Sequence, residues 1–274
     1  MSRPVDAVID FLEAEQARGV SHILLDDGAR DGLRELYLRA AKGIRPAAPA
    51  SSPSPAPAAA TVAHGSGSKA ERLAALRQQA ENWQPARSLG TLRETMVFAT
   101  GNPDARIVLV GEAPGYQEEK EREPFVGPAG QKLNDILKAM GITREEVYIS
   151  NIVKFRPATP RQTTNNRKPT PEEMASCMPF IREELAIIRP QCVIALGGTA
   201  AEGLLGLTGA VTAMRGRWYD FEGIPTRVTY HPSYLLQSGG SNAVKRQVWE
   251  DMLAVMEHLH MPISEKQRGY FLAK

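Results

Sequence analysis

The stretch RIVLVGEAPGYQEE, residues 106–119, decides the fold of this chain. Its apolar residues from Ile107 to Val110 are followed at once by Gly-Glu-Ala-Pro-Gly. A short apolar run that glycine and proline end is typical of a buried strand with a tight turn behind it. Glu112 therefore lies at the carboxyl end of a predicted strand. This position makes it a candidate functional residue, with a structural or merely solvated role as the alternative.

Length and composition bound the classes of protein that the chain can belong to. The 274 residues suggest one or two domains, 42% of them are apolar, and the net charge is only +2. A nucleic-acid partner must therefore be argued from local charge. The two cysteines, Cys177 and Cys192, exclude a disulfide scaffold and a four-cysteine metal site. Residues 1–30 lack the apolar core of a signal peptide, and no run has the roughly 20 apolar residues of a membrane span. We expect a soluble, cytoplasmic protein without membrane contact.

The chain divides into three predicted parts. Residues 1–44 form a helical N-terminal segment, because residues 3–18 and 31–43 have helical apolar spacing. Residues 45–68 consist almost wholly of Ala, Pro, Ser and Gly, which predicts a flexible linker. Residues 69–274 form the predicted globular domain.

Within this domain the pattern alternates between strands and helices. The predicted strands cover residues 106–110, 147–154, 191–196 and 226–230. The predicted helices cover residues 69–82, 128–140, 171–187, 198–205 and 242–259. Thr170, Pro171 and Glu173 give the third of these helices a strong start signal. The alternation predicts an α/β fold in which helices cover both faces of a parallel sheet. Sites in such sheets lie outside the carboxyl ends of the strands.

Three predicted strand ends carry polar side chains. Glu112 follows the first strand, Asn151 and Lys154 lie near the end of the second, and His231 follows the last. Taken singly, an asparagine at a strand end is usually a turn residue, and a histidine before proline is usually structural. Their shared position predicts that a carboxylate, a carboxamide and an imidazole meet at one edge of the sheet.

Two loops add candidate binding residues. Phe125 lies in the glycine-rich segment REPFVGPAG (122–130), where its ring either stacks on a flat ligand or packs the loop onto the core. The segment KFRPATPRQTTNNRK (154–168) has basic residues and no acidic one, which suits a phosphate backbone. A solvated basic loop is the alternative. The basic residues are Lys154, Arg156, Arg161, Arg167 and Lys168.

The ordered motifs VGEAPG, PFVGPAG, SNIVKFRP, RKPTPEEMASC and HPSYLL resemble the uracil-DNA glycosylase superfamily, most closely its family 4. The resemblance covers about residues 90–262. It implies a three-layer α/β/α sandwich with a short, mostly parallel central sheet. It also implies hydrolysis of the N-glycosidic bond of deoxyuridine in DNA, with the uracil flipped out of the helix.

The resemblance also implies residue roles. Glu112 would position the attacking water and face the cationic sugar, and His231 would donate a hydrogen bond to O2 of the departing uracil. Asn151 would read the base edge and reject cytosine. The further implied contacts are stacking by Phe125, a backbone N–H from Ala113, exclusion of the thymine methyl by Glu118, a wedge at Leu235 or Leu236, and phosphate contacts from the basic loop and Ser233.

The cysteines depart from the family pattern. The resemblance to family 4 implies a [4Fe–4S] cluster held by four cysteines, because the enzymes of that family share this feature. Here residues 1–176 contain no cysteine, Phe155 occupies the third cysteine position, and only Cys177 matches a ligand position. Cys192 lies in an apolar strand and is interpreted as a core thiol. We therefore predict no iron–sulfur cluster and no other metal.

Alternative hypotheses follow from this departure. The chain is either a glycosylase for uracil, a glycosylase for another deaminated base such as hypoxanthine, or a DNA-binding member without catalysis. The presence of all three polar residues favours catalysis. The basic loop has no histidine between Lys154 and Pro169, so we expect hydrolytic turnover without a covalent DNA adduct. We expect a monomer, with residues 1–44 available to a protein partner.

Overall fold

The computed structural model describes residues 67–237, 239 and 241–272. By its contacts the chain forms two units, Met1–Ala58 and Ala59–Lys274, and the description below concerns the second. The predicted helical segment 1–44 and nearly all of the predicted linker lie outside the described residues. No helix in the described part of the chain is long and apolar enough to cross a membrane.

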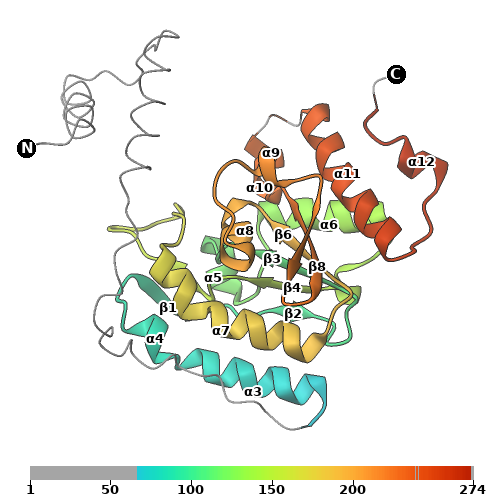
Figure 1. Cartoon of the computed structure of the whole chain (residues 1–274). Helices are drawn as coiled ribbons and strands as arrows, with labels where there is room; N and C mark the ends of the chain where they lie inside the picture. The colour runs from blue at the N-terminus through green and yellow to red at the C-terminus, as the bar shows by residue number, and fades with distance from the viewer. Residues whose placement is uncertain (1–66, 238, 240, 273–274) are drawn as a thin grey trace, which may run out of the picture. The chain divides into compact units, whose positions relative to one another are not determined.

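A six-stranded sheet forms the centre of the domain (Figure 1). Its order is β2 (Thr100–Gly101), β4 (Tyr148–Asn151), β3 (Ile107–Gly111), β6 (Cys192–Leu196), β8 (Ile224–Thr229) and β7 (Trp218–Phe221). The four inner strands are parallel, and the two edge strands are antiparallel to their neighbours. The predicted mostly parallel sheet is therefore confirmed.

Helices cover both faces of this sheet. The helices are α3 (Lys69–Glu81), α4 (Gln84–Arg87), α5 (Tyr116–Glu121), α6 (Pro128–Met140), α7 (Pro171–Ile188), α8 (Gly198–Leu205), α9 (Val211–Met214), α10 (Pro232–Gln237), α11 (Asn242–His258) and α12 (Glu265–Arg268), with a 3-10 turn η1 (Arg144–Glu146). One face packs under α7 and α8, and the other under α6 and α11 (Figure 1). This arrangement gives the three layers that were expected.

Strand β3 shows why its sequence is a continuous apolar run. Val108 and Val110 belong to the apolar core on the α7 side, whereas Ile107 and Leu109 belong to the core on the α11 side. All four are buried. A strand covered on both faces needs apolar residues at every position, so it shows no alternation of apolar and polar residues.

The second predicted strand, 147–154, is wrong in its extent. Strand β4 ends at Asn151, and residues beyond it form β5 (Phe155–Pro157), which pairs antiparallel with β1 (Leu92–Met96) in a separate small sheet. Between the two strands, the backbone N–H groups of Ile152 and Val153 donate to the carbonyl groups of Gly111 and Glu112. These bonds fasten the exit of β3 to the turn after β4, and the chain then leaves the central sheet.

Candidate active site

The strand register aligns the carboxyl ends of the parallel strands. Gly111 in β3 pairs with Asn151 in β4, and Leu196 in β6 pairs with Thr229 in β8. A cavity of about 360 Å³ opens at this edge. Its lining includes eight predicted site residues, Glu112, Ala113, Glu118, Phe125, Asn151, Arg167, His231 and Ser233, and five others, Pro114, Gly115, Ala129, Asn166 and Gln237.

The carboxylate of Glu112 is half-buried at the cavity wall. Its Oε2 accepts a hydrogen bond from Thr199 Oγ1 at 2.5 Å. Burial raises the pKa of Glu112, while the Thr199 hydrogen bond and the charge of Lys168 act in the opposite direction. The Glu112 side chain therefore lines the cavity while one of its carboxylate oxygens is held by the hydrogen bond from Thr199.

The imidazole of His231 is held in one tautomer. The backbone N–H of Ser233 donates to His231 Nδ1 (3.2 Å), and Ser233 Oγ lies 2.8 Å from the same atom. Because Nδ1 accepts, the proton of the neutral ring is assigned to Nε2. Burial lowers the pKa of His231 to about 4, so the ring is neutral at neutral pH. A neutral imidazole with Nε2–H is a hydrogen-bond donor to a developing anion.

Phe125 is held against the cavity by a strained loop. Its backbone φ is +55°, a value that non-glycine residues rarely adopt. The Arg144 guanidinium donates to the carbonyl groups of Pro124 and Phe125. The Phe125 ring centroid lies 5.6 Å from that of His231, and its ring also packs in the α11-side core. The ring therefore packs in the core, as one interpretation expected, and it also lines the cavity, while stacking on a flat ligand stays a prediction.

Gly111 allows Phe125 and Asn151 to meet. A Cβ atom at position 111 would lie 2.4 Å from Asn151 Oδ1 and 2.5 Å from Phe125 Cζ. Atoms at those distances overlap strongly, so a side chain here would displace both residues from the cavity. The glycine before Glu112 is thus a requirement of the site.

Glu118 connects two loops of the cavity wall. Its carboxylate accepts hydrogen bonds from the backbone N–H groups of Gly115 (3.2 Å) and Gly127 (2.9 Å). These bonds fix the turn after β3 to the loop that carries Phe125. The side chain is therefore a rigid part of the wall.

The predicted phosphate contacts of Lys154 and Arg156 are wrong. Both side chains are buried, at 0% and 2% exposure. Lys154 Nζ lies 2.6 Å from a carboxylate oxygen of Glu184. Arg156 binds the carboxylate of Glu119 (2.9 Å) and the amide oxygen of Asn166 (3.0 Å). Neither cation is accessible to DNA, because both side chains are buried, and each is paired with a carboxylate of the domain.

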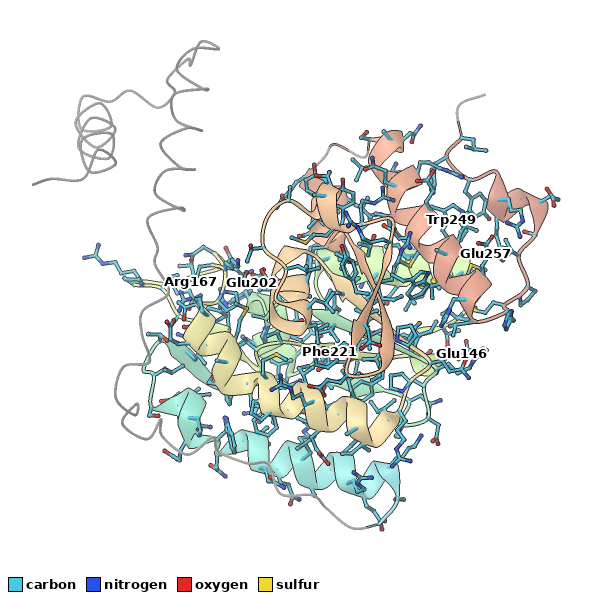
Figure 2. All side chains as sticks on the ribbon, viewed as in Figure 1. Glu146, Arg167, Glu202, Phe221, Trp249 and Glu257 are labelled. Atoms are coloured by element: carbon cyan, nitrogen blue, oxygen red, sulfur yellow. The ribbon has the colours of Figure 1, made fainter. Side chains whose placement is uncertain are left out.

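The other basic residues of the loop differ in their accessibility. Arg167 lines the cavity, but its guanidinium forms a two-point ion pair with buried Glu173 and donates to backbone carbonyls. Lys168 is 57% exposed and pairs with Glu202 in α8 at 2.6 Å. Arg167 and Glu202 are labelled in Figure 2 near this edge of the domain. Arg161 is exposed and has a positive φ of 50°.

The two leucines after HPSY are not equivalent. Leu236 is 43% exposed. Leu235 lines a different, apolar pocket together with Ile136 of α6 and Trp249 of α11. The wedge prediction is therefore corrected for Leu235, because its side chain anchors α10 to the domain.

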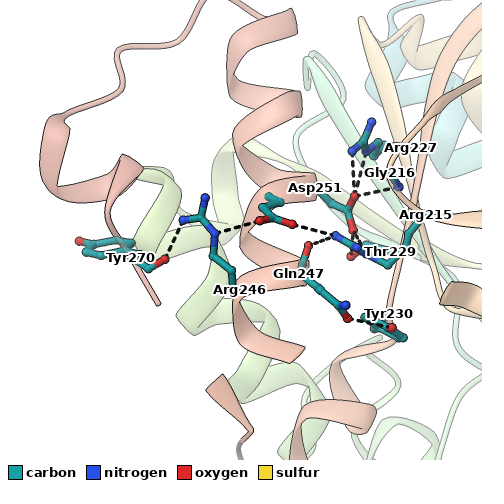
Figure 3. A network of polar contacts seen from close by, with 10 residues as sticks. Arg215, Gly216, Arg227, Thr229, Tyr230, Arg246, Gln247, Asp251 and Tyr270 are labelled. Carbon is teal, nitrogen blue, oxygen red and sulfur yellow. Dashed lines mark hydrogen bonds and ion pairs between the residues drawn. The ribbon is translucent and has the colours of Figure 1, made fainter. Parts of the chain in front are cut away.

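A buried acid contacts the end of β8 through Thr229 (Figure 3). Asp251 in α11 is 0% exposed and receives hydrogen bonds from Arg215, Arg227 and Thr229. Thr229 is the last residue of β8 and lies two positions before His231. This network therefore holds the last residue of β8 against α11, two positions before His231.

Two polar residues of the site escaped the sequence analysis, Thr199, which contacts Glu112, and Asn166, which lines the cavity. Thr199 follows Gly197 and Gly198 at the carboxyl end of β6, so the strand-end argument finds it when it is applied to the third predicted strand, residues 191–196. Asn166 lies in an irregular loop, and no sequence pattern marks it. The amide oxygen of Asn166 accepts a hydrogen bond from Arg156. The NH₂ group of Asn166 points away from Arg156 and lies near Gly115.

The thiols do not fit a four-cysteine iron–sulfur cluster. Cys177 is buried in the α7-side core, and Cys192 is buried in the α11-side core across the sheet. Burial raises the pKa of both thiols, that of Cys192 to about 12. Phe155, 1% exposed, packs in the same core as Cys177. Among the described residues, no group of three or more His, Cys, Asp or Glu side chains could hold a metal ion.

Comparisons with known proteins identify relatives of this domain. Residues 98–253 match the family model of the uracil DNA glycosylase superfamily. The chain is 46% identical to a type-4 uracil-DNA glycosylase of Thermotoga maritima over 165 residues, which are 58% of this chain and 81% of that protein. It is 40% identical over 148 residues to a type-4 uracil-DNA glycosylase of Archaeoglobus fulgidus, covering 51% of this chain and 71% of the relative. A type-4 uracil-DNA glycosylase of Pyrobaculum aerophilum is 35% identical over 153 residues, 53% of this chain and 75% of its own length.

Proposed function

The chain belongs to the uracil DNA glycosylase superfamily, and from this premise we propose that it hydrolyses the N-glycosidic bond of deoxyuridine in DNA. The products are free uracil and an abasic site, which makes the chain a DNA repair enzyme. The observation that carries the proposal is the meeting of Glu112, Asn151 and His231 in one cavity at the strand ends.

The reaction separates charge between sugar and base. As the bond breaks, the deoxyribose becomes cationic and the uracil becomes anionic. The carboxylate of Glu112 faces the sugar, stabilises its positive charge and orients the water that attacks C1′. His231, neutral because its pKa is lowered to about 4, donates Nε2–H to O2 of the departing uracil and so stabilises the developing anion.

Base recognition uses other residues of the same cavity. The Asn151 amide donates to uracil O4 and accepts from N3–H, and cytosine presents the reverse pattern. Phe125 stacks on the flipped ring, and the backbone N–H of Ala113 contacts the base. Glu118 crowds C5 and excludes the thymine methyl, with its position supported by the bonds to Gly115 and Gly127.

The DNA strand lies along the rim of the cavity. Leu236 fills the gap that the flipped base leaves, and its 43% exposure supports this role. Arg161 and Lys168 contact flanking phosphates, since both are exposed. Ser233 acts by holding the His231 ring, and Arg167 by holding the loop.

The finer properties of the protein are proposed as follows. It holds no iron–sulfur cluster, because its two thiols lie in separate cores. It works in the cytoplasm as a monomer, without membrane contact, and residues 1–44 bind a protein partner. Size-exclusion chromatography tests the monomeric state. A deletion of residues 1–66 tests the binding of a protein partner.

The test of the proposed function is excision from a fluorescent single-stranded oligonucleotide that carries one uracil. Alkaline cleavage of abasic sites reports the product. We expect excision by the native protein and a loss of roughly two or more orders of magnitude in Glu112→Gln and Glu112→Ala. Excision of hypoxanthine in place of uracil would reassign the substrate, and no excision of either base would show a DNA-binding member without catalysis.

A further inference from the structure

The carboxylate of Glu112 accepts a hydrogen bond from Thr199, a residue that has no role in the reaction proposed above. Thr199, in the first turn of α8, is only 6% exposed, and its hydroxyl donates to Glu112 Oε2 at 2.5 Å. The two residues come from different strand ends, 87 positions apart in the chain. The bond therefore connects the exit of β3 with the exit of β6.

We propose that Thr199 is a positioning residue for Glu112, holding Oε2 so that Oε1 faces the attacking water. This inference rests on the proposed function. A threonine hydroxyl has one proton to donate, and here the donation goes to a carboxylate oxygen. A carboxylate held by one oxygen loses rotational freedom, so the other oxygen keeps a fixed direction toward the cavity.

The same bond favours the ionised form of Glu112. Burial raises the pKa of this carboxyl, and the hydrogen bond from Thr199 lowers it. Without that donor the pKa moves further upward, because desolvation is then opposed only by the charge of Lys168. The carboxylate fraction at a given pH falls, and activity that requires the carboxylate begins at a higher pH.

Other charged and titratable groups line the cavity or act on Glu112 through their charge. His231 follows β8, and Glu118 belongs to α5. Arg167 is paired with Glu173, and Lys168 is paired with Glu202, which lies in α8 three residues after Thr199. A substitution confined to Thr199 leaves all of these groups in place, so a shifted pH profile reports the lost hydrogen bond.

The experiment compares Thr199→Val, which keeps the shape and removes the hydroxyl, with Thr199→Ser, which keeps the hydroxyl. Thr226→Val is the matched control, because Thr226 is also buried but its hydroxyl donates to the backbone of Ile224. Single-turnover excision of uracil is measured in the full chain across pH, together with the unfolding midpoint of each variant.

We expect Thr199→Val to lower excision at neutral pH by roughly 10- to 100-fold and to move the acidic limb to higher pH. Thr199→Ser should restore both properties, and Thr226→Val should change neither. In a Glu112→Gln background, Thr199→Val should have little further effect, since the two residues act as a unit. A valine variant with native rate and native pH profile would overturn the inference.

A second measurement separates this inference from the proposed function. The pKa of Glu112 is followed by carbon NMR of glutamate-labelled native protein and of Thr199→Val. A higher pKa in the variant supports the positioning role even if the native protein excises no uracil. An unchanged pKa would overturn the positioning role even if the native protein is active.

Discussion

The imidazole of His231 shows how one half-buried residue sets the behaviour of the site. We predict that its ring stays neutral as the pH falls, until about pH 4, because burial lowers its pKa from 6.5 to about 4. Nitrogen NMR of the ring in the native protein measures this, with the exposed His260 as an internal control. A His231 midpoint near 6.5 would contradict a neutral donor shielded from water.

The same shift has a consequence for stability. Between pH 6.5 and about 4 the unfolded chain binds the proton at this position and the folded chain does not. The free energy of unfolding therefore falls as the pH is lowered through this window. We predict a shallower fall in His231→Gln over the same window. Urea unfolding of both proteins at several pH values tests this, and parallel curves would show that the histidine has no part in it.

At the residue level the sequence predicts positions at strand ends better than it predicts charge partners. Glu112, Asn151 and His231 were expected at one edge, and all three line the cavity. The basic residues Lys154 and Arg156 were expected on the surface but are buried. Composition shows a positive segment, but it cannot show that the neutralising carboxylates come from α5 and α7.

At the level of elements, the buried pair Lys154–Glu184 fastens the link between β4 and β5 to α7. Ser150 completes it, accepting from Lys154 (2.6 Å) and donating to Glu184 (2.7 Å). We predict that Lys154→Met lowers the free energy of unfolding by about 3–5 kcal/mol, because it leaves a buried carboxylate without its cation. Urea unfolding measures the change.

Two variants serve as controls for this prediction. The double variant Lys154→Met with Glu184→Leu should recover most of the lost stability, since neither charge is then left buried. Lys168→Met removes an ion pair in which the lysine is 57% exposed, and it should cost at most about 1 kcal/mol. A Lys154→Met variant as stable as Lys168→Met would contradict the internal role of Lys154.

The boundaries of elements were predictable where caps mark them. The predicted helices 128–140 and 198–205 coincide with α6 and α8, and the capping box at Thr170 and Glu173 begins α7 as expected. The short strands β1, β2, β5 and β7 were missed. They have two to five residues, too few for a periodic pattern, and their pairing with distant segments decides their conformation.

At the scale of the whole domain, the order of strands creates the site. Strand β3 lies between β4 and β6, so the turn with Glu112 has Asn151 on one side and Thr199 on the other. The sequence predicts parallel strands and their carboxyl ends, but it gives no order for them, since that order depends on how the crossover helices pack. The sequence alone therefore could not identify Thr199 as the hydrogen-bond partner of Glu112.

The same sheet separates the two thiols, and this leads to a prediction about iron. Cys177, a residue of α7, packs in the core on one face of the sheet, and Cys192, in β6, packs in the core on the other face, so one metal centre cannot use both. Phe155 and the residues around it fill the α7-side core with apolar side chains. We predict that protein from iron-supplemented cells, purified without oxygen, contains no stoichiometric iron, and that Cys177→Ala with Cys192→Ala keeps native excision. About four iron atoms per chain, lost together with activity in the double variant, would show that the thiols serve a cluster after all.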